Sequence, residues 1–165
     1  MLAAGAASRY GAPKQRVYLP AVLERLARTP VGEVVVVEGA HPLDGVPLGS
    51  ARLVRCADWA RGPGASLRCG LAALGPEVEA AVVVLADGPE LDPRAVRRLL
   101  ARRGDAPVVA ASYDGTRDHP AVLARSAWAS VPDEGARALD AVLVDCSDLQ
   151  PPGDLDYPPG ARPGQ

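Results

Sequence analysis

The feature that most constrains the fold of this 165-residue chain is the alternation of short valine-rich runs with helical stretches. Continuous apolar runs such as 34–37 and 82–85 are typical of strands covered on both faces, as in a parallel sheet under helices. The expected strands are Glu33–Glu38, Ala80–Ala86, Pro107–Ser112 and Ala141–Asp145, with Arg52–Arg55 as a further candidate. The expected helices are Ala21–Arg28, Ser66–Leu74, Pro93–Arg103 and a short one near Glu134–Leu139. This alternation predicts an open α/β sandwich with right-handed crossovers.

The helix expected at Pro93–Arg103 has the clearest local signals. Asp92 is a favourable N-cap, and Pro93 follows it at the first helical position. One face of this segment is apolar, and the remaining positions carry five arginines. We therefore expect the basic run to form a solvated face.

The two ends of the chain differ from the middle. At most four residues precede Gly5, so that the first strand is either very short or cut off by a chain that begins late in its gene. Residues 149–165 are rich in proline and glycine, which predicts an irregular tail. We expect a single domain over residues 1–165.

Charge and composition exclude several classes of protein. Eighteen basic and 20 acidic residues give a net charge of −2, which offers no basic surface for nucleic acid. No apolar run approaches 18 residues and the start lacks the features of a signal peptide, so we expect a cytoplasmic protein without a membrane partner. Cys56, Cys69 and Cys146 are odd in number and widely spread, which indicates neither a disulfide framework nor a zinc site. We expect them to pack as small apolar side chains.

The densest chemical signal lies in residues 2–14. Small residues and two glycines, Gly5 and Gly11, would let backbone N–H groups approach an anion, and Arg9 and Lys14 add positive charge. Lys14 is the single lysine beside 17 arginines, which suggests a position that needs a compact charge on a flexible stem. The spacing is neither that of a Walker A loop nor that of a dinucleotide-binding turn. A phosphate cradle and an ordinary loop therefore both remain open on these residues alone.

Taken as a whole, this segment resembles the glycine-rich signature of the MobA-like nucleotidyltransferases. Further segments resemble motifs of the molybdopterin cytidylyltransferase branch, in the same order along nearly the whole chain: 58–71, 84–89, His119-Pro120, 133–137 and 154–156. The resemblance implies a three-layer α/β/α sandwich of the Rossmann-like nucleotide-diphospho-sugar transferase type, with a mainly parallel sheet. It also implies Mg²⁺-dependent transfer of CMP or GMP from an NTP to molybdopterin, with release of pyrophosphate. The Leu-Ala-Ala-Gly sequence favours CTP over GTP.

The resemblance also assigns roles to single residues. It implies that Lys14, Arg9 and Asp87 are catalytic, that Asp87 and Asp156 bind the metal, with Asp154 as the second choice, and that His119 contacts the acceptor substrate. It implies nucleotide contacts for Leu2, Ala3, Ala4, Gly5, Ser8, Gly11, Gly64, Ala65 and Ser66. Without the resemblance, Asp87 could cap a turn, Ser66 could be a helix N-cap, His119 could be a surface residue and the acids of the tail could be solvated.

Three departures from the family pattern, at Gly88, Asp118 and Tyr157, concern the acceptor side more than the NTP side. Two alternatives therefore stay open: transfer to a sugar- or polyol-phosphate, and a nucleotide-binding accessory protein without catalysis. The expected partners are an NTP and a molybdopterin-like acceptor, with transient contact to a molybdoenzyme or its chaperone.

Overall fold

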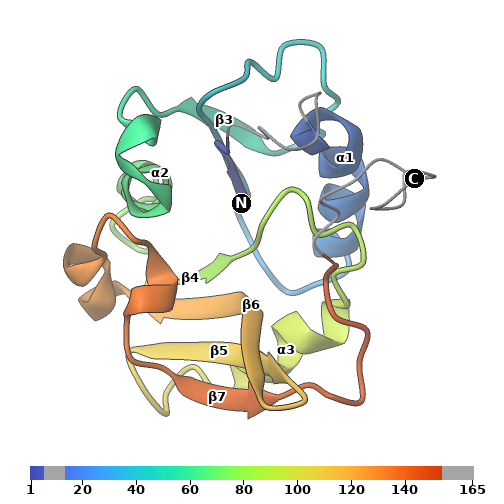
Figure 1. Ribbon diagram of the computed structural model, residues 1–165, viewed down its shortest axis with the longest axis vertical. Helices are drawn as coiled ribbons and strands as arrows, with labels where there is room; N and C mark the ends of the chain where they lie inside the picture. Colours follow the sequence, from blue (N-terminus) through green and yellow to red (C-terminus); the bar gives the residue numbers. More distant parts are fainter. Residues whose placement is uncertain (6–13, 154–165) are drawn as a thin grey trace, which may run out of the picture.

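The computed structural model describes residues 1–5 and 14–153, which form three α-helices and seven strands (Figure 1). The strands are β1 (Leu2–Ala3), β2 (Val35–Glu38), β3 (Arg52–Arg55), β4 (Ala80–Val83), β5 (Val108–Tyr113), β6 (Thr116–Ala124) and β7 (Val142–Asp145). The α-helices are α1 (Lys14–Leu26), α2 (Pro63–Ala72) and α3 (Pro93–Ala101). Short 3₁₀ helices are η1 (Trp59–Arg61), η2 (Arg125–Ser130) and η3 (Ala136–Ala138).

The strands form two sheets that meet at one bridge. The first has the order β1-β2-β3 and is parallel, with Leu2 opposite Val37. The second has the order β4-β6-β5-β7, in which β6 is antiparallel to both neighbours and β5 is parallel to β7. A single parallel bridge between Leu2 and Leu85 joins β1 to the residues that follow β4. The strands therefore line up in the order β3-β2-β1-β4-β6-β5-β7.

Helices cover both faces of this sheet (Figure 1). On one face, α1 and α3 bury apolar side chains such as Leu19, Val22 and Leu99 against the strands. On the other face, α2 places Leu67 and Leu71 beside η2 and η3. The expected α/β/α sandwich with a parallel-rich sheet is confirmed, and the arginines of α3 lie on its outer side, where Arg94 pairs with the N-cap Asp92.

Several boundaries differ from the sequence-based expectation. Helix α1 begins seven residues before Ala21, because its buried positions keep the helical period through Pro20. Helix α2 begins at Pro63 after Gly62, so Ser66 lies inside the helix and is not its N-cap. The helix expected near Glu134–Leu139 is only the 3₁₀ turn η3.

The antiparallel strand β6 was not expected from the sequence. Its first half carries polar and charged residues and it contains Pro120, which hides the strand pattern. The missed signal is Asp114-Gly115, the turn between β5 and β6, where both residues have positive φ angles of 51° and 77°. An Asp-Gly pair between apolar runs is a typical hairpin turn.

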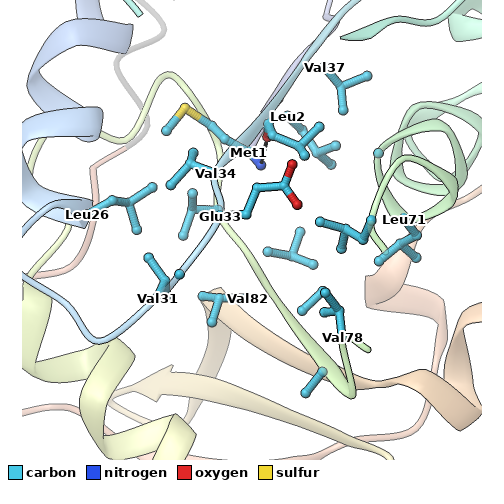
Figure 2. A pocket seen from close by; sticks show the side chains of 18 of the residues that line it. Met1, Leu2, Leu26, Val31, Glu33, Val34, Val37, Leu71, Val78 and Val82 are labelled. Carbon is cyan, nitrogen blue, oxygen red and sulfur yellow. Dashed lines mark hydrogen bonds between the residues drawn. The ribbon is translucent and has the colours of Figure 1, made fainter. Parts of the chain in front are cut away.

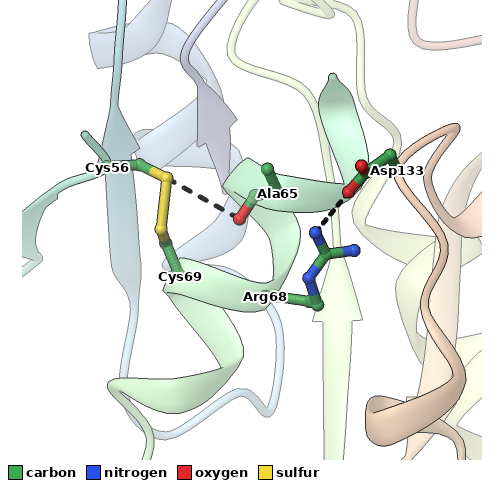
Figure 3. Close-up of a disulfide and its surroundings, with 5 residues drawn as sticks. All are labelled: Cys56, Ala65, Arg68, Cys69 and Asp133. Atoms are coloured by element: carbon green, nitrogen blue, oxygen red, sulfur yellow. Dashed lines mark hydrogen bonds and ion pairs between the residues drawn. A yellow bond between two sulfur atoms is a disulfide. The ribbon is translucent and has the colours of Figure 1, made fainter. Parts of the chain in front are cut away.

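The expectation that all three cysteines are unpaired was wrong for two of them. Cys56, directly after β3, forms a disulfide with Cys69 in α2, 13 residues further on (Figure 3). Their Cα atoms lie 5.8 Å apart because α2 packs back against the end of β3, and this separation is typical of a disulfide. Spacing along the chain did not reveal this contact. Cys146 is unpaired and buried, as expected.

The longest of the described helices, α1, has 13 residues. Among the described residues no helix has both the length and the apolar character needed to span a bilayer.

Candidate active site

A cavity of about 310 Å³ opens where β1 ends and where the chain leaves β4. Ligands of open α/β sheets gather beyond the carboxyl ends of the strands, which is where this cavity lies. Its lining comes from β1 and the following loop, from the residues after β4, from η1, and from the starts of α1 and α2. The lining residues are Leu2, Ala4, Gly5, Gln15, Trp59, Ala60, Gly62, Pro63, Ser66, Leu85 and Asp87.

An ion pair between Lys14 and Asp87 connects two of the predicted catalytic residues. Lys14 is the first residue of α1, and its Nζ lies 2.8 Å from Oδ2 of Asp87. The side chains are only 10% and 18% exposed, so both charges are held at the edge of the cavity and largely out of solvent. The arrangement offers a cation for phosphate and a carboxylate for a divalent metal in one place.

Some residues of the short segment from Leu2 to Gly5 line the cavity, and one is part of the core. Leu2, Ala4 and Gly5 line the cavity, whereas Ala3 is buried against α1 and β2. Gln15, which sequence reasoning missed, donates from Nε2 to the Gly5 carbonyl at 3.2 Å. Its Oε1 is buried and has no partner among the described residues. Gln15 therefore holds the start of the loop, and its Oε1 faces no donor from residues 1–5 or 14–153.

Arg9, Ser8 and Gly11 lie outside the described residues, as do Asp154 and Asp156 of the tail. Their predicted roles stay predictions.

The start of α2 forms the opposite wall. Ser66 lines the cavity, while Gly64 and Ala65 are buried behind it. The Gly64 N–H donates to the Asp133 carbonyl at 2.9 Å, so this amide is already engaged within the protein. A Cβ at position 64 would lie 1.7 Å from the Pro132 carbonyl oxygen, which means that only glycine fits.

Arg68 of α2 and Arg61 of η1 hold this wall against the turn that contains Asp133. Arg68 pairs with the Asp133 carboxylate (Figure 3). Arg68 also donates to the Val131 carbonyl at 2.7 Å, and Arg61 lies 3.2 Å from the same carboxylate. The hydrogen bond from Arg68 is the main reason why the pKa of Asp133 lies below its usual range. No sequence motif pointed to Arg68 as the partner. Together with the disulfide on the other side, these contacts fix the wall of the cavity.

His119 lies at a second, smaller cavity of about 90 Å³, which Asp87 also lines. His119 is half-buried, and the loss of water around its imidazole lowers its pKa below the ordinary value. Its Nδ1 has no partner among the described residues. Beside it, Arg137 pairs with Asp118 at 2.9 Å. Asp87 therefore stands between the two cavities, with His119 and a guanidinium on its far side.

The described residues contain no cluster of three or more His, Cys, Asp or Glu side chains able to hold a metal. Asp87 is the one predicted metal ligand whose place is described. A single protein carboxylate is nevertheless compatible with Mg²⁺, which completes its coordination with waters and with phosphate oxygens of a substrate.

Solved structures share this fold. A homologue of Mycobacterium tuberculosis Rv0371c, from Mycobacterium sp. strain JC1, superposes with a TM-score of 0.79 at 23% identity, covering 95% of this chain and 88% of the other. Rv0371c from M. tuberculosis H37Rv in complex with manganese gives 0.68 at 20% identity, covering 87% and 84%. A 4-diphosphocytidyl-2C-methyl-D-erythritol synthase from Anaerococcus prevotii gives 0.65 at 13% identity, covering 94% and 89%.

No curated protein sequence matches the chain. The sequence model of the MobA-like NTP transferase domain, in contrast, matches residues 1–145, which is most of the chain. The chain therefore belongs to the MobA-like NTP transferase family, a family of nucleotidyltransferases.

Proposed function

We propose that this nucleotidyltransferase binds an NTP in the larger cavity and an acceptor at the His119 cavity, with Asp87 between them. The observation that carries the proposal is the Lys14–Asp87 pair at the junction of the two cavities. A reaction between two bound molecules needs such a shared boundary, because the reacting atoms must come within contact distance.

On the NTP side, we assign the triphosphate to Gly5 and Lys14, and to Ser8, Arg9 and Gly11 of the same loop. Leu2, Ala4 and Ser66 would contact the base and the ribose from the walls of the cavity. Ala3, Gly64 and Ala65 would act from behind, because they are buried and support the residues that line the space. The unused Oε1 of Gln15 offers a further acceptor on this side.

In the proposed reaction, an oxygen of the acceptor attacks the α-phosphorus of the NTP, and the bond from that phosphorus to the pyrophosphate oxygen breaks. Negative charge moves onto the leaving pyrophosphate. Lys14, and Arg9 by family resemblance, would stabilise that charge, which is the main contribution a protein makes to phosphoryl transfer. A phosphate nucleophile is already ionised at neutral pH, so that no general base is required.

Asp87 would hold a divalent ion, and we propose Asp156 as the second ligand. The manganese complex of a protein with this fold supports a divalent metal, and we propose that Mg²⁺ is the natural ion. When bound, Mg²⁺ neutralises phosphate charge. Since the Lys14 ammonium now lies at the Asp87 carboxylate, metal binding requires it to turn toward the phosphates.

For the acceptor we favour molybdopterin and for the nucleotide CTP, on the family resemblance of residues 58–71, 119–120 and 133–137. A polyol-phosphate acceptor is the second candidate. It is favoured by the structural similarity to the A. prevotii protein, whose name includes the polyol methylerythritol. The His119 cavity, with Arg137 beside it, suits an anionic acceptor of either kind.

The test is release of pyrophosphate from CTP and GTP with Mg²⁺, with and without molybdopterin, and with methylerythritol phosphate as the alternative acceptor. We expect pyrophosphate only with CTP and molybdopterin together. Release with the polyol phosphate instead would move the assignment to the second candidate. A rise in melting temperature with NTP but no pyrophosphate with any acceptor would indicate an accessory protein. If the melting temperature does not rise and no pyrophosphate is released, nucleotide binding is refuted.

A further inference from the structure

The Cys56–Cys69 disulfide joins α2 to the end of β3 beside the candidate NTP cavity (Figure 3). Cys69 follows Ser66, a residue of the cavity lining, by three positions in α2. Residues three apart in a helix are neighbours on its surface, so the disulfide lies about one helical turn from the cavity wall. Cys56 in turn precedes Trp59, which also lines the cavity, by three positions. Both cysteines are therefore close to the lining, although neither takes part in the transfer reaction proposed above.

Helix α2 packs closely on β2 at the turn that carries Cys69. A Cβ at Gly70 would lie 2.8 Å from Cγ2 of Val37 in β2, so the helix backbone comes near the strand here. The next residue of the helix, Leu71, points with Val37 into the same apolar cavity (Figure 2). Apolar contacts have no preferred direction, so they hold α2 on the sheet without fixing its position along β2. The disulfide supplies that fixed point.

On its other side, α2 is held by contacts that do not involve sulfur. Arg68 pairs with the Asp133 carboxylate and donates to the Val131 carbonyl, and the Gly64 N–H donates to the Asp133 carbonyl. These contacts do not depend on the disulfide bond. Without that bond, α2 would stay with the turn that contains Asp133 and could move relative to Gly5 on the opposite wall of the cavity.

The surroundings of the two sulfur atoms suit the reduced state as well as the oxidised one. Cys69 is half-buried, whereas Cys56 is only 1% exposed, which makes Cys69 the residue that a small thiol can approach. Sγ of Cys56 lies 3.6 Å from the Ala65 carbonyl oxygen, within reach of an S–H···O hydrogen bond (Figure 3). The disulfide has no S–H group, but a reduced Cys56 can donate to this carbonyl. Reduction therefore leaves the buried thiol with a partner.

We propose that this disulfide is a redox switch for nucleotide binding, an inference that rests on the proposed NTP site. A thiolate of a dithiol reductant attacks Sγ of Cys69, the S–S bond breaks, and its electron pair goes to Sγ of Cys56, which takes up a proton. The second thiol of the reductant then displaces Cys69 as a thiol, and the reductant leaves with an internal disulfide, its two protons now on the two cysteines. In the oxidised state, α2 holds Ser66 at the cavity. In the reduced state, α2 shifts and NTP binding weakens.

The test is isothermal titration of CTP with Mg²⁺ into the oxidised chain and into the chain reduced with dithiothreitol. We expect the Kd for CTP to rise at least about fivefold on reduction, which is the lower end of typical coupling between two sites. Cys69→Ala should bind CTP as weakly as the reduced chain and should not respond to dithiothreitol. The matched control is Cys146→Ala, which should keep the full response because Cys146 is unpaired.

Failure of the switch and failure of the proposed function give different results in this titration. Equal Kd values in the two redox states refute the switch and leave the NTP site in place. Absence of CTP binding in both states refutes the proposed NTP site, and the switch with it.

Amide hydrogen exchange follows α2 in the absence of any nucleotide. On reduction, we expect the amides of Leu67 and Leu71 in α2 to exchange at least about tenfold faster relative to the amide of Leu99 in α3. The reference in α3 separates movement of α2 from a loss of overall stability. Unchanged relative exchange would overturn the inference, because α2 would then be held equally well in both redox states.

Discussion

Replacing Gly64 with alanine should damage both the stability and the nucleotide site, because the space for a side chain there is already filled by backbone. An added Cβ would lie 1.7 Å from the Pro132 carbonyl oxygen and 3.0 Å from the Asp133 carbonyl carbon. Real Cβ contacts are essentially never shorter than 3.0 Å. The turn at 132–133 or the start of α2 must therefore move by about 1.3 Å.

The size of the effect follows from that displacement. Overpacking of a well-packed site typically costs about 1–3 kcal/mol, and in a chain of this length each kcal/mol lowers Tm by about 2–4 °C. The same movement shifts Ser66, which lines the candidate NTP cavity two residues further along α2. Misplacement by about 1 Å can reduce catalysis about 100-fold.

The matched control is Gly104→Ala, since a Cβ at Gly104 meets nothing within 4 Å. Thermal unfolding should give a Tm for Gly64→Ala about 2–12 °C below that of the unchanged chain, while Gly104→Ala stays within about 2 °C. Isothermal titration with CTP and Mg²⁺ should show weaker binding for Gly64→Ala alone. If Gly64→Ala keeps both its Tm and its CTP affinity, the close contact between α2 and the 132–133 turn is not a feature of the molecule.

Three further predictions concern single charged groups. Lys14→Met should lower kcat/KM for pyrophosphate release by about 10²–10³, whereas Arg103→Met in the exposed turn after α3 should leave it unchanged; equal activities would remove Lys14 from the reaction. The pKa of Asp133 is lowered in the folded protein, so its contribution to stability is present above the unfolded pKa and is lost as pH falls; urea unfolding between pH 6 and 3 should show a steeper loss than in Asp133→Asn. Burial lowers the pKa of the Met1 ammonium from 8.0 to about 5, so the unfolded chain binds more protons between these values. Stability should therefore rise with pH across that window, by up to about 1.4 kcal/mol per unit, and this rise should vanish when Met1 is acetylated.

Local patterns in the sequence predicted the order of strands and helices well, because buried strands and capped helices leave strong signals over short distances. Asp92 caps α3 as expected, accepting a hydrogen bond from the Arg94 N–H at 2.8 Å. The same reasoning failed at β6, where the stabilising contacts are with β4 and β5 and the strand itself carries charged residues and a proline.

The residues of the candidate site likewise fall into those that the sequence predicted and those that depend on contacts between distant segments. Family resemblance singled out Lys14 and Asp87, and the fold brings them within 2.8 Å although 73 positions separate them in sequence. Arg68, Gln15 and the Cys56–Cys69 disulfide were missed, because each depends on how α1 and α2 pack against distant segments. Contacts of this kind have no fixed spacing along the chain and can be recognised only in three dimensions.

The sheet consists of two halves, β1-β2-β3 and β4-β6-β5-β7, and the single bridge between Leu2 and Leu85 is the seam at which they meet. The larger cavity straddles it, since Gly5 continues from the three-stranded half and Asp87 from the four-stranded half. A small rotation about the seam would change the gap between the two walls without breaking either half. The Lys14–Asp87 ion pair spans the same gap. A triphosphate that draws Lys14 away from Asp87 would gain a counter-charge and would also remove a contact that holds the two halves of the sheet together.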